Sequence, residues 1–148
     1  MMNFFTALFE IVKALWSWSI FLGLLGGAFS YLLVTFYFRP ILRYMEIRDQ
    51  IVSDLVFYAD ATNAKGLNEK MQAKVWDRCE SNRRHSANLR ACHLNLPSTY
   101  KWYLRIRKEK PDAAAKEMMG FSNTFDHEAA AQRVDNIKEY LRIDSEEI

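Results

Sequence analysis

The sequence predicts an all-α protein, with a single N-terminal transmembrane helix followed by a small cytoplasmic helical bundle. Residues 14–38 carry no charged side chain, whereas residues 39–148 hold all but two of the charges. The 148 residues include only five Gly and three Pro, which are the residues that strands joined by tight turns need at regular intervals. We therefore expect an amphipathic start and transmembrane anchor over 1–38 and a cytoplasmic α-helical domain over 39–148.

The uncharged run 14–38 is long enough to cross a bilayer. As a helix that rises about 1.5 Å per residue it would extend roughly 37 Å, against a hydrocarbon core of about 30 Å. Trp16 and Trp18 near one end and Tyr37 near the other are aromatic residues of the kind that favour membrane interfaces. These features predict a retained anchor that spans the membrane once.

The cations that flank the span predict its orientation. Arg39, Arg43 and Arg48 follow the span, against Lys13 and the terminal amine before it. Since the more positive flank stays on the cytoplasmic side, the C-terminal domain should be cytoplasmic. Its two cysteines would then lie in a reducing compartment, where a structural disulfide is not expected.

Residues 2–13 leave two interpretations open. Phe4, Phe5 and their apolar neighbours form a broad surface interrupted by Glu10 and Lys13. The segment either lies in the interface or begins a longer span, or it is inserted with its charges facing a partner or a watery path. A second full crossing does not fit, because each crossing needs roughly 20 residues.

Small residues within the span predict self-association. Gly23 and Gly27 form one small-xxx-small pair, and Gly26 with Ser30 forms another. Such pairs let two helix backbones approach closely in lipid, where packing rather than hydrophobicity drives association. Apolar spans also carry such pairs by chance, so the pattern alone leaves both interpretations open.

Helical spacing of apolar residues continues after the span. A helix of about 20 residues should begin near Ile41, with Pro40 at a bend or in its first turn, and Asn63–Asn68 with Gly66 should form a loop. The further expected helices are about Asn68–Asn95, Tyr100–Lys108 after the Leu96-Pro97-Ser98 break, a fourth around Ala113–Met119, and a fifth from Asp126-His127-Glu128. We expect the fourth helix to end at Gly120 and to expose polar groups near Phe121.

Residues that could carry chemistry are not arranged in a known pattern. Cys79, His85, Cys92 and His93 match none of the usual zinc spacings, and Cys79 is predicted to be a core residue. No Gly-x-Ser-x-Gly, papain-like or phosphate-loop motif is present. We predict no metal, no cofactor, no small-molecule substrate and no enzymatic activity.

Basic residues are the remaining candidates for contact with a partner or an anion. Four arginines, Arg78 among them, lie along the second soluble helix, and five basic residues against one acid, Glu109, lie between Ser98 and Lys110. Beside Trp102 and Tyr103 they could bind lipid headgroups, nucleic acid or an acidic protein, or form a solvated face, which the net charge of +2 favours. The candidates are Arg83, Arg84, Arg90, Lys101, Arg105, Arg107 and Lys108.

Four segments resemble a family of small bacterial membrane-anchored helical proteins, the transmembrane effectors of retron anti-phage defence systems. They are the anchor with Gly23 and Gly27, Leu55-Val56-Phe57-Tyr58-Ala59, Leu96-Pro97, and Met119-Gly120-Phe121-Ser122-Asn123. The resemblance implies a toxin of the bacterial inner membrane, held silent by a reverse transcriptase with its RNA-linked DNA until infection disturbs that complex. Activation would damage the membrane and stop growth in an abortive infection. No catalytic residue is implied.

Two other functions fit the same residues. In one, the chain is a membrane-anchored scaffold or assembly subunit whose bundle docks a cytoplasmic protein. In the other, which depends on the basic residues alone, it is a lipid- or nucleic-acid-binding module. Membrane lipid and a second copy of the chain are the partners expected for the effector.

Overall fold

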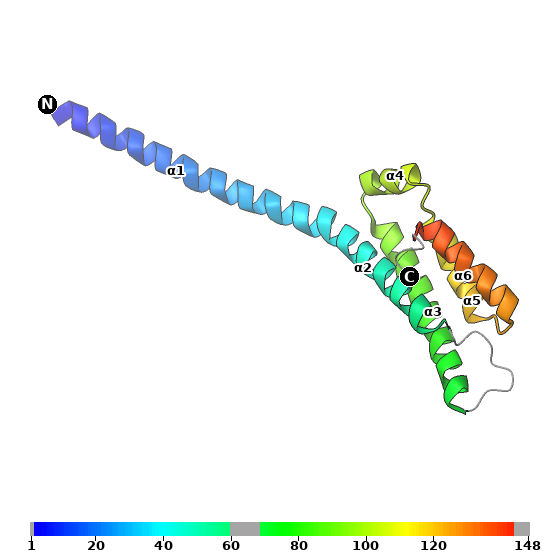
Figure 1. The fold of residues 1–148 in the computed structure, drawn as a ribbon. Helices are drawn as coiled ribbons and strands as arrows, with labels where there is room; N and C mark the ends of the chain where they lie inside the picture. Colours follow the sequence, from blue (N-terminus) through cyan, green and yellow to red (C-terminus); the bar gives the residue numbers. More distant parts are fainter. Residues whose placement is uncertain (1, 60–68, 144–148) are drawn as a thin grey trace. The chain divides into compact units, whose positions relative to one another are not determined.

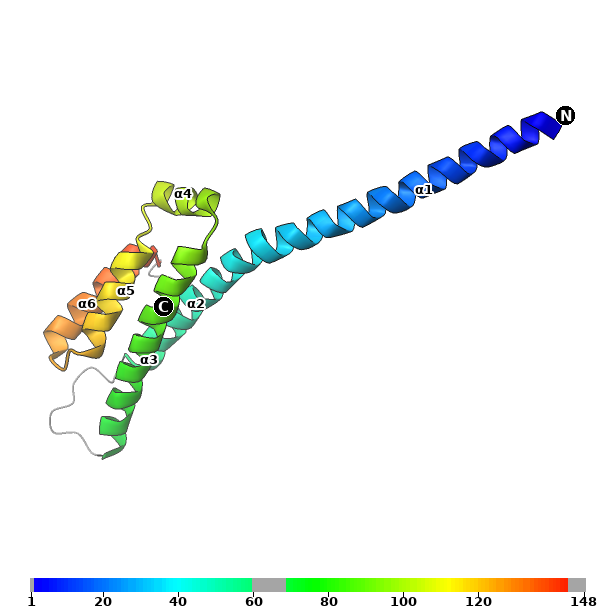
Figure 2. The ribbon, with the colours of Figure 1, turned by 180° about the vertical axis from the view of Figure 1, so that it is seen from behind.

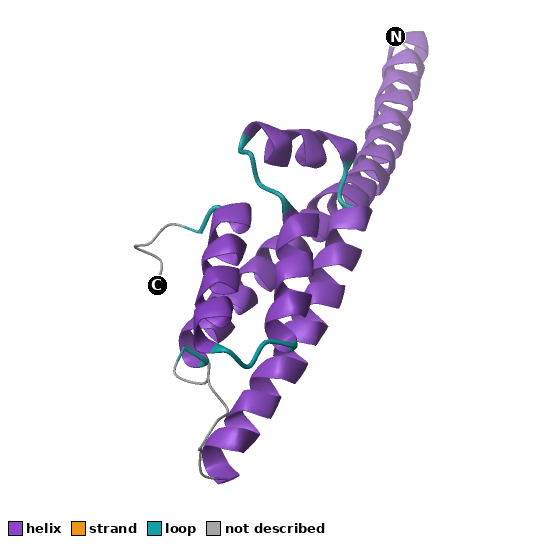
Figure 3. Ribbon diagram, turned by 90° about the vertical axis from the view of Figure 1, so that its right-hand side faces the viewer, coloured by secondary structure: helices purple, strands orange, loops and turns teal. Residues whose placement is uncertain are grey.

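The computed structural model describes residues 2–59 and 69–143, and their side chains from Trp18 onward. Every regular element in these residues is a helix, as Figure 3 shows, so the all-α prediction is confirmed. The chain divides into two compact units, Met1–Arg39 and Pro40–Ile148. The expected loop at 63–68 lies outside the described residues. The elements are α1 Met2–Leu33, the π-helix η1 Val34–Phe38, α2 Arg39–Phe57, α3 Glu69–Asn95, α4 Ser98–Ile106, α5 Pro111–Ser122 and α6 His127–Leu141.

The first unit is the apolar helix α1 with η1. Every residue from Trp18 to Val34 is exposed, as expected of a helix that needs surroundings other than water. Among the described residues, one helix is long and apolar enough to cross a membrane, and it lies near the N-terminus. Residues 2–17 belong to α1, but their side chains lie outside the described part, so both interpretations of 2–13 stay predictions.

Pro40 explains the wide π turn that precedes α2. A proline has no N–H to donate, and its ring crowds the carbonyl four residues earlier, which here belongs to Phe36. The backbone N–H of Arg39 instead bonds to the carbonyl oxygen of Val34, five residues back. This turn closes its hydrogen bond over one more residue than an α-helical turn does. The α-helix then resumes, and Pro40 lies in the first turn of α2.

The core of the second unit is formed by α2, α3, α5 and α6. Small residues let α5 and α6 pack closely: Ala114 and Ala115 of α5 and Ala130 of α6 are fully or almost fully buried. In Figures 1 and 2, α5 lies along α3, and α6 lies beside α5. Longer buried side chains attach α2 to this core, namely Tyr44, Ile47, Ile51 and Leu55.

Helix α4 lies across one end of this bundle (Figures 1 and 2). It begins two residues before the predicted start, because the carbonyl of Pro97 already accepts from the N–H groups of Tyr100 and Lys101. It also ends earlier, since Lys108 adopts a left-handed backbone with φ of 58°. Leu104, only 2% exposed, fixes the helix to the core.

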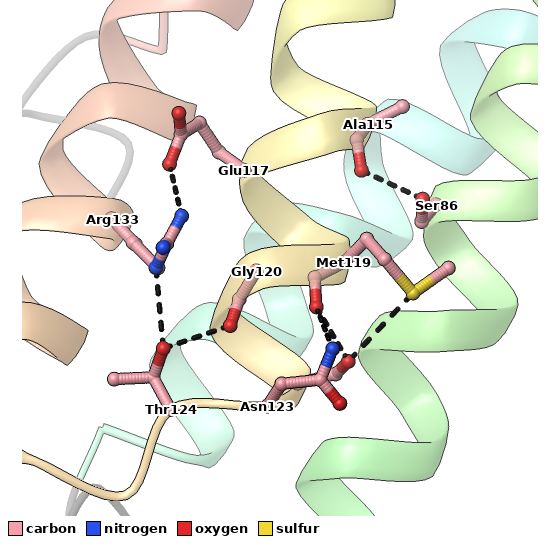
Figure 4. Close-up of polar contacts among 9 residues, drawn as sticks. Ser86, Ala115, Glu117, Met119, Gly120, Asn123, Thr124 and Arg133 are labelled. Atoms are coloured by element: carbon pink, nitrogen blue, oxygen red, sulfur yellow. Dashed lines mark hydrogen bonds and ion pairs between the residues drawn. The ribbon is translucent and has the colours of Figure 1, made fainter.

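The prediction that Gly120 ends the fourth soluble helix is wrong. Helix α5 continues to Ser122, and Phe121 is buried with 2% exposure. The glycine instead makes room for a side chain of α6, because a Cβ at this position would overlap the guanidinium of Arg133. That guanidinium donates to Glu117 at 2.9 Å and to Thr124 at 3.2 Å (Figure 4).

The prediction that the last helix begins at Asp126-His127-Glu128 is confirmed. The side chain of Asp126 accepts a hydrogen bond from the N–H of Ala129 at 3.1 Å and caps α6. Arg142, with φ of 51°, closes the other end of the helix. Cys79, with 2% exposure, is a core residue as predicted.

Candidate functional site

The glycine face predicted for helix association lies open on α1. Gly23, Gly26, Gly27 and Ser30 are all exposed. A Cβ added at any of the three glycines would meet nothing within 4 Å. The bare backbone of this face is therefore accessible to a second helix, which is the geometry that close packing in lipid requires.

The predicted basic residues of α3 do not form one cluster. Arg83, Arg84 and Arg90 are exposed. Arg83 donates to the side-chain oxygen of Asn123 at 2.9 Å, so it ties α3 to the end of α5. Arg90 lines a shallow cavity of about 350 Å³ together with Asp112 and Lys116. Arg83 and Arg90 therefore have different neighbours.

The predicted basic residues at α4 come together more closely. A groove of about 510 Å³ is lined by Lys101, Arg105 and Lys110, with Asp112 among its acidic residues. Arg105 also borders a second cavity of about 300 Å³, which Lys108, Lys110 and Glu139 line as well. Arg105 and Lys110 thus line both hollows, and Glu109 lines both as well.

Aromatic rings accompany these cations. The guanidinium of Arg107 lies 5.8 Å from the centre of the Tyr103 ring, and a hydrogen bond to Tyr103 raises the pKa of the guanidinium further above its ordinary value. The ring of Tyr100 lies 5.5 Å from that of Tyr103, between the surface and the core. Burial raises the pKa of the Tyr100 phenol, and the negative charge of Glu109 adds to the effect.

The one acid between Ser98 and Lys110 is buried beside these cations. Glu109 is only 6% exposed, and its carboxylate accepts a hydrogen bond from the Tyr44 hydroxyl of α2. The sequence counts Glu109 against five basic residues, yet the structure leaves little of its side chain in contact with solvent. Its neighbours in the sequence gave no sign of this burial, because Lys108 and Lys110 are both exposed.

A second polar cluster joins α2 to α3. The Asp54 carboxylate accepts from the Ser81 hydroxyl, and the same carboxylate oxygen lies 2.8 Å from His85 Nε2. In a Ser-His-Asp triad the serine hydroxyl is bonded to the imidazole. Here both Ser81 and His85 bond to Asp54 instead, so the cluster joins two helices and does not have the geometry of that triad.

Arg78 is buried, whereas the sequence places it among the surface arginines. It is 0% exposed, its guanidinium carbon lies 4.4 Å from the centre of the Phe121 ring, and Nη2 donates to the Thr124 carbonyl at 2.9 Å. Its Nε and Nη1 atoms have no hydrogen-bond partner. The helical spacing of the sequence could have indicated this burial, because Arg78 falls on the same side of α3 as the buried Val75 and Asn82.

The four residues considered for metal binding are Cys79, His85, Cys92 and His93. Within the residues that the structure describes, no group of three or more His, Cys, Asp or Glu side chains could hold an ion. Cys79 and Cys92 are buried free thiols, and burial raises the pKa of the Cys92 thiol. His93 Nδ1 lies 3.1 Å from the Asp112 carboxylate.

Comparison with known proteins assigns the chain to no group: no family model, no curated protein and no solved structure matches it.

Proposed function

We propose that this chain is a membrane-anchored effector of a bacterial anti-phage defence system, which damages the inner membrane when its anchors associate. The observation that carries the proposal is the open glycine face of α1, where Gly23, Gly26 and Gly27 have no side chain over them. In lipid, such a face is the strongest available contact between two identical helices. Association through it gives the anchor a role beyond fixing the protein at the membrane.

The defence setting follows the resemblance in the anchor and in three soluble segments. In that setting the C-terminal helical bundle lies in the cytoplasm. It binds a reverse transcriptase with RNA-linked DNA and so holds the anchors apart. Release of this partner lets the anchors cluster. A cluster with Glu10 and Lys13 near the interface would admit water and ions.

The test is overproduction of the full chain in bacteria with a potential-sensitive dye. We expect rapid loss of membrane potential and growth arrest. The variant Gly23→Leu with Gly27→Leu should abolish both effects and remain in the membrane fraction, because leucine holds the backbones apart. The control variant Phe21→Leu with Leu25→Val alters side chains on the opposite side of the helix, at least about 100° from each residue of the glycine face, and should be as toxic as the original chain. Undiminished killing by the double leucine variant contradicts association through the glycines.

A membrane-anchored scaffold is the second candidate, and one surface feature favours it. Trp76 of α3 is 63% exposed and packs edge to face against Phe125, which is 39% exposed, with ring centres 6.1 Å apart. An exposed aromatic pair on a folded helix is the kind of anchor that protein interfaces bury. Normal growth and an unchanged potential on overproduction would favour this function over the effector.

A further inference from the structure

Helix α4 carries large apolar side chains on its exposed face as well as on its buried face. Leu104 is buried at 2% exposure, and Trp102 and Ile106 each lie two positions from it, about 200° around the helix. They are 64% and 58% exposed. The helix therefore has one apolar face in the core and a second one pointing outward.

Cations surround this outward face. Lys101, Arg105, Arg107, Lys108 and Lys110 lie on α4 and on the segment that follows it. None of them forms an ion pair among the described residues; Lys101 donates to the Leu94 carbonyl at 2.8 Å. The acid of this segment, Glu109, is buried against Tyr44. Of the nearby acids, Asp112 lies beside His93, and Glu139 borders the cavity next to Lys108.

We propose that α4 and the basic segment 107–110 bind the surface of a membrane that contains anionic phospholipid. Trp102 and Ile106 would enter the headgroup layer, where an indole ring is favoured. The surrounding cations would lie over lipid phosphates, and each of them strengthens the binding several-fold at physiological salt. The proposal requires the anchor to be in a membrane but does not depend on effector activity.

The choice of a membrane over nucleic acid follows from the apolar residues. Nucleic-acid surfaces take cations and flat aromatic rings, and an exposed Ile106 has no counterpart there. At a membrane, isoleucine and tryptophan between basic residues form the pattern of interfacial helices. The apolar helix near the N-terminus also supplies a lipid surface at high local concentration, so weak binding by a nine-residue helix is sufficient.

The test uses the full chain in lipid vesicles and Trp102 as the probe. A variant with Trp16, Trp18 and Trp76 replaced by Phe leaves only this indole, and a sister variant retains only Trp76 on α3. Vesicles contain phosphatidylcholine alone or with phosphatidylglycerol, and a brominated lipid quenches indoles that enter the bilayer. In anionic vesicles we expect blue-shifted Trp102 emission and quenching about threefold stronger than at Trp76, with the difference reduced by high salt.

Charge reversal distinguishes specific docking from general attraction. Arg105→Glu with Lys108→Glu should return Trp102 to the quenching seen in neutral vesicles. The matched control, Lys70→Glu with Lys74→Glu, makes the same change in net charge on α3 and should leave Trp102 quenched. Circular dichroism and urea midpoints verify that each variant is folded.

Three results would overturn the proposal. They are equal Trp102 emission in neutral and anionic vesicles, quenching that survives charge reversal at Arg105 and Lys108, and release of Trp102 from lipid by a low concentration of a DNA or RNA oligonucleotide. The last result would assign the surface to nucleic acid instead.

Discussion

The hydroxyl of Tyr44 on α2 donates a hydrogen bond to the carboxylate of Glu109, 65 positions later in the chain. Both residues are buried, with 1% and 6% exposure. The bond joins α2 to the segment between α4 and α5. It also buries the one acid between Ser98 and Lys110, so every exposed charged side chain between these two residues is basic.

Removal of this donor should destabilise the bundle. The variant Tyr44→Phe leaves the Glu109 carboxylate buried without its partner, which should cost about 1–3 kcal/mol of unfolding free energy. The measurement is urea unfolding of the full chain in detergent micelles, followed by circular dichroism. Tyr140→Phe is the matched control, because no described hydrogen bond involves its hydroxyl, and it should lose far less stability. Equal losses would show that the Tyr44 bond contributes nothing specific.

The same contact predicts a loss of stability at alkaline pH. Burial, the hydrogen bond to Glu109 and its negative charge raise the pKa of the Tyr44 phenol far above the ordinary value of 10.0. The folded chain thus retains a proton that the unfolded chain releases above about pH 10, so stability falls as pH rises, by up to about 1.4 kcal/mol per pH unit from this group. Below about pH 10 the Tyr44 phenol is protonated in both states, so it does not change the unfolding free energy with pH.

Comparison of two chains isolates this effect, because Tyr100 and Cys92 also have raised pKa values. Urea midpoints measured between pH 8.5 and 11 should fall more steeply for the original chain than for Tyr44→Phe. Parallel curves would mean that the Tyr44 phenol does not stay protonated in the folded chain.

The polar cluster between α2 and α3 gives a third prediction. Asp54→Ala removes the acceptor of both Ser81 and His85, and the ring of His85, whose Nδ1 is already unpartnered, is left buried without any hydrogen bond. We expect a loss of about 1–3 kcal/mol in the same urea assay. Asp49→Ala on the exposed side of α2 is the control and should stay within about 0.5 kcal/mol of the original chain.

Local signals in the sequence predict most of the fold. Asp126 identifies the start of α6 because a capping carboxylate needs only the next three residues. Gly120 misleads for the opposite reason: glycine after an apolar run is typical of a helix end, but here Arg133, from another helix, requires the space. That requirement becomes visible only when α5 and α6 are packed together.

Some features of the candidate sites also follow from local spacing, whereas others depend on packing between helices. Gly23 and Gly27 lie on one helix, so their shared face follows from spacing alone. The basic surround of α4 depends on Tyr44, a residue of a different helix, which buries Glu109. For Arg78 two sequence features disagree. Its charge predicts exposure, whereas its position on α3 predicts burial, and the structure shows it packed against Phe121.

The space beside Gly120 supports a last prediction. Gly120→Ala should gain about 1 kcal/mol from helix propensity. It should lose a similar amount, because the new Cβ displaces the Arg133 guanidinium, whose Cζ lies 2.6 Å from that position, from Glu117 and Thr124. An ion pair this exposed is worth roughly 0.2–1 kcal/mol, so the net change should stay within about 0.5 kcal/mol.

The two contributions separate when Arg133 is shortened. In a chain carrying Arg133→Ala, no guanidinium occupies the space beside residue 120, so adding Gly120→Ala should stabilise the bundle by about 0.5–1 kcal/mol. Four urea curves, for the original chain, the two single variants and the double variant, give the coupling free energy between the two positions. A coupling near zero would mean that Arg133 does not constrain residue 120, and the glycine would then need another explanation.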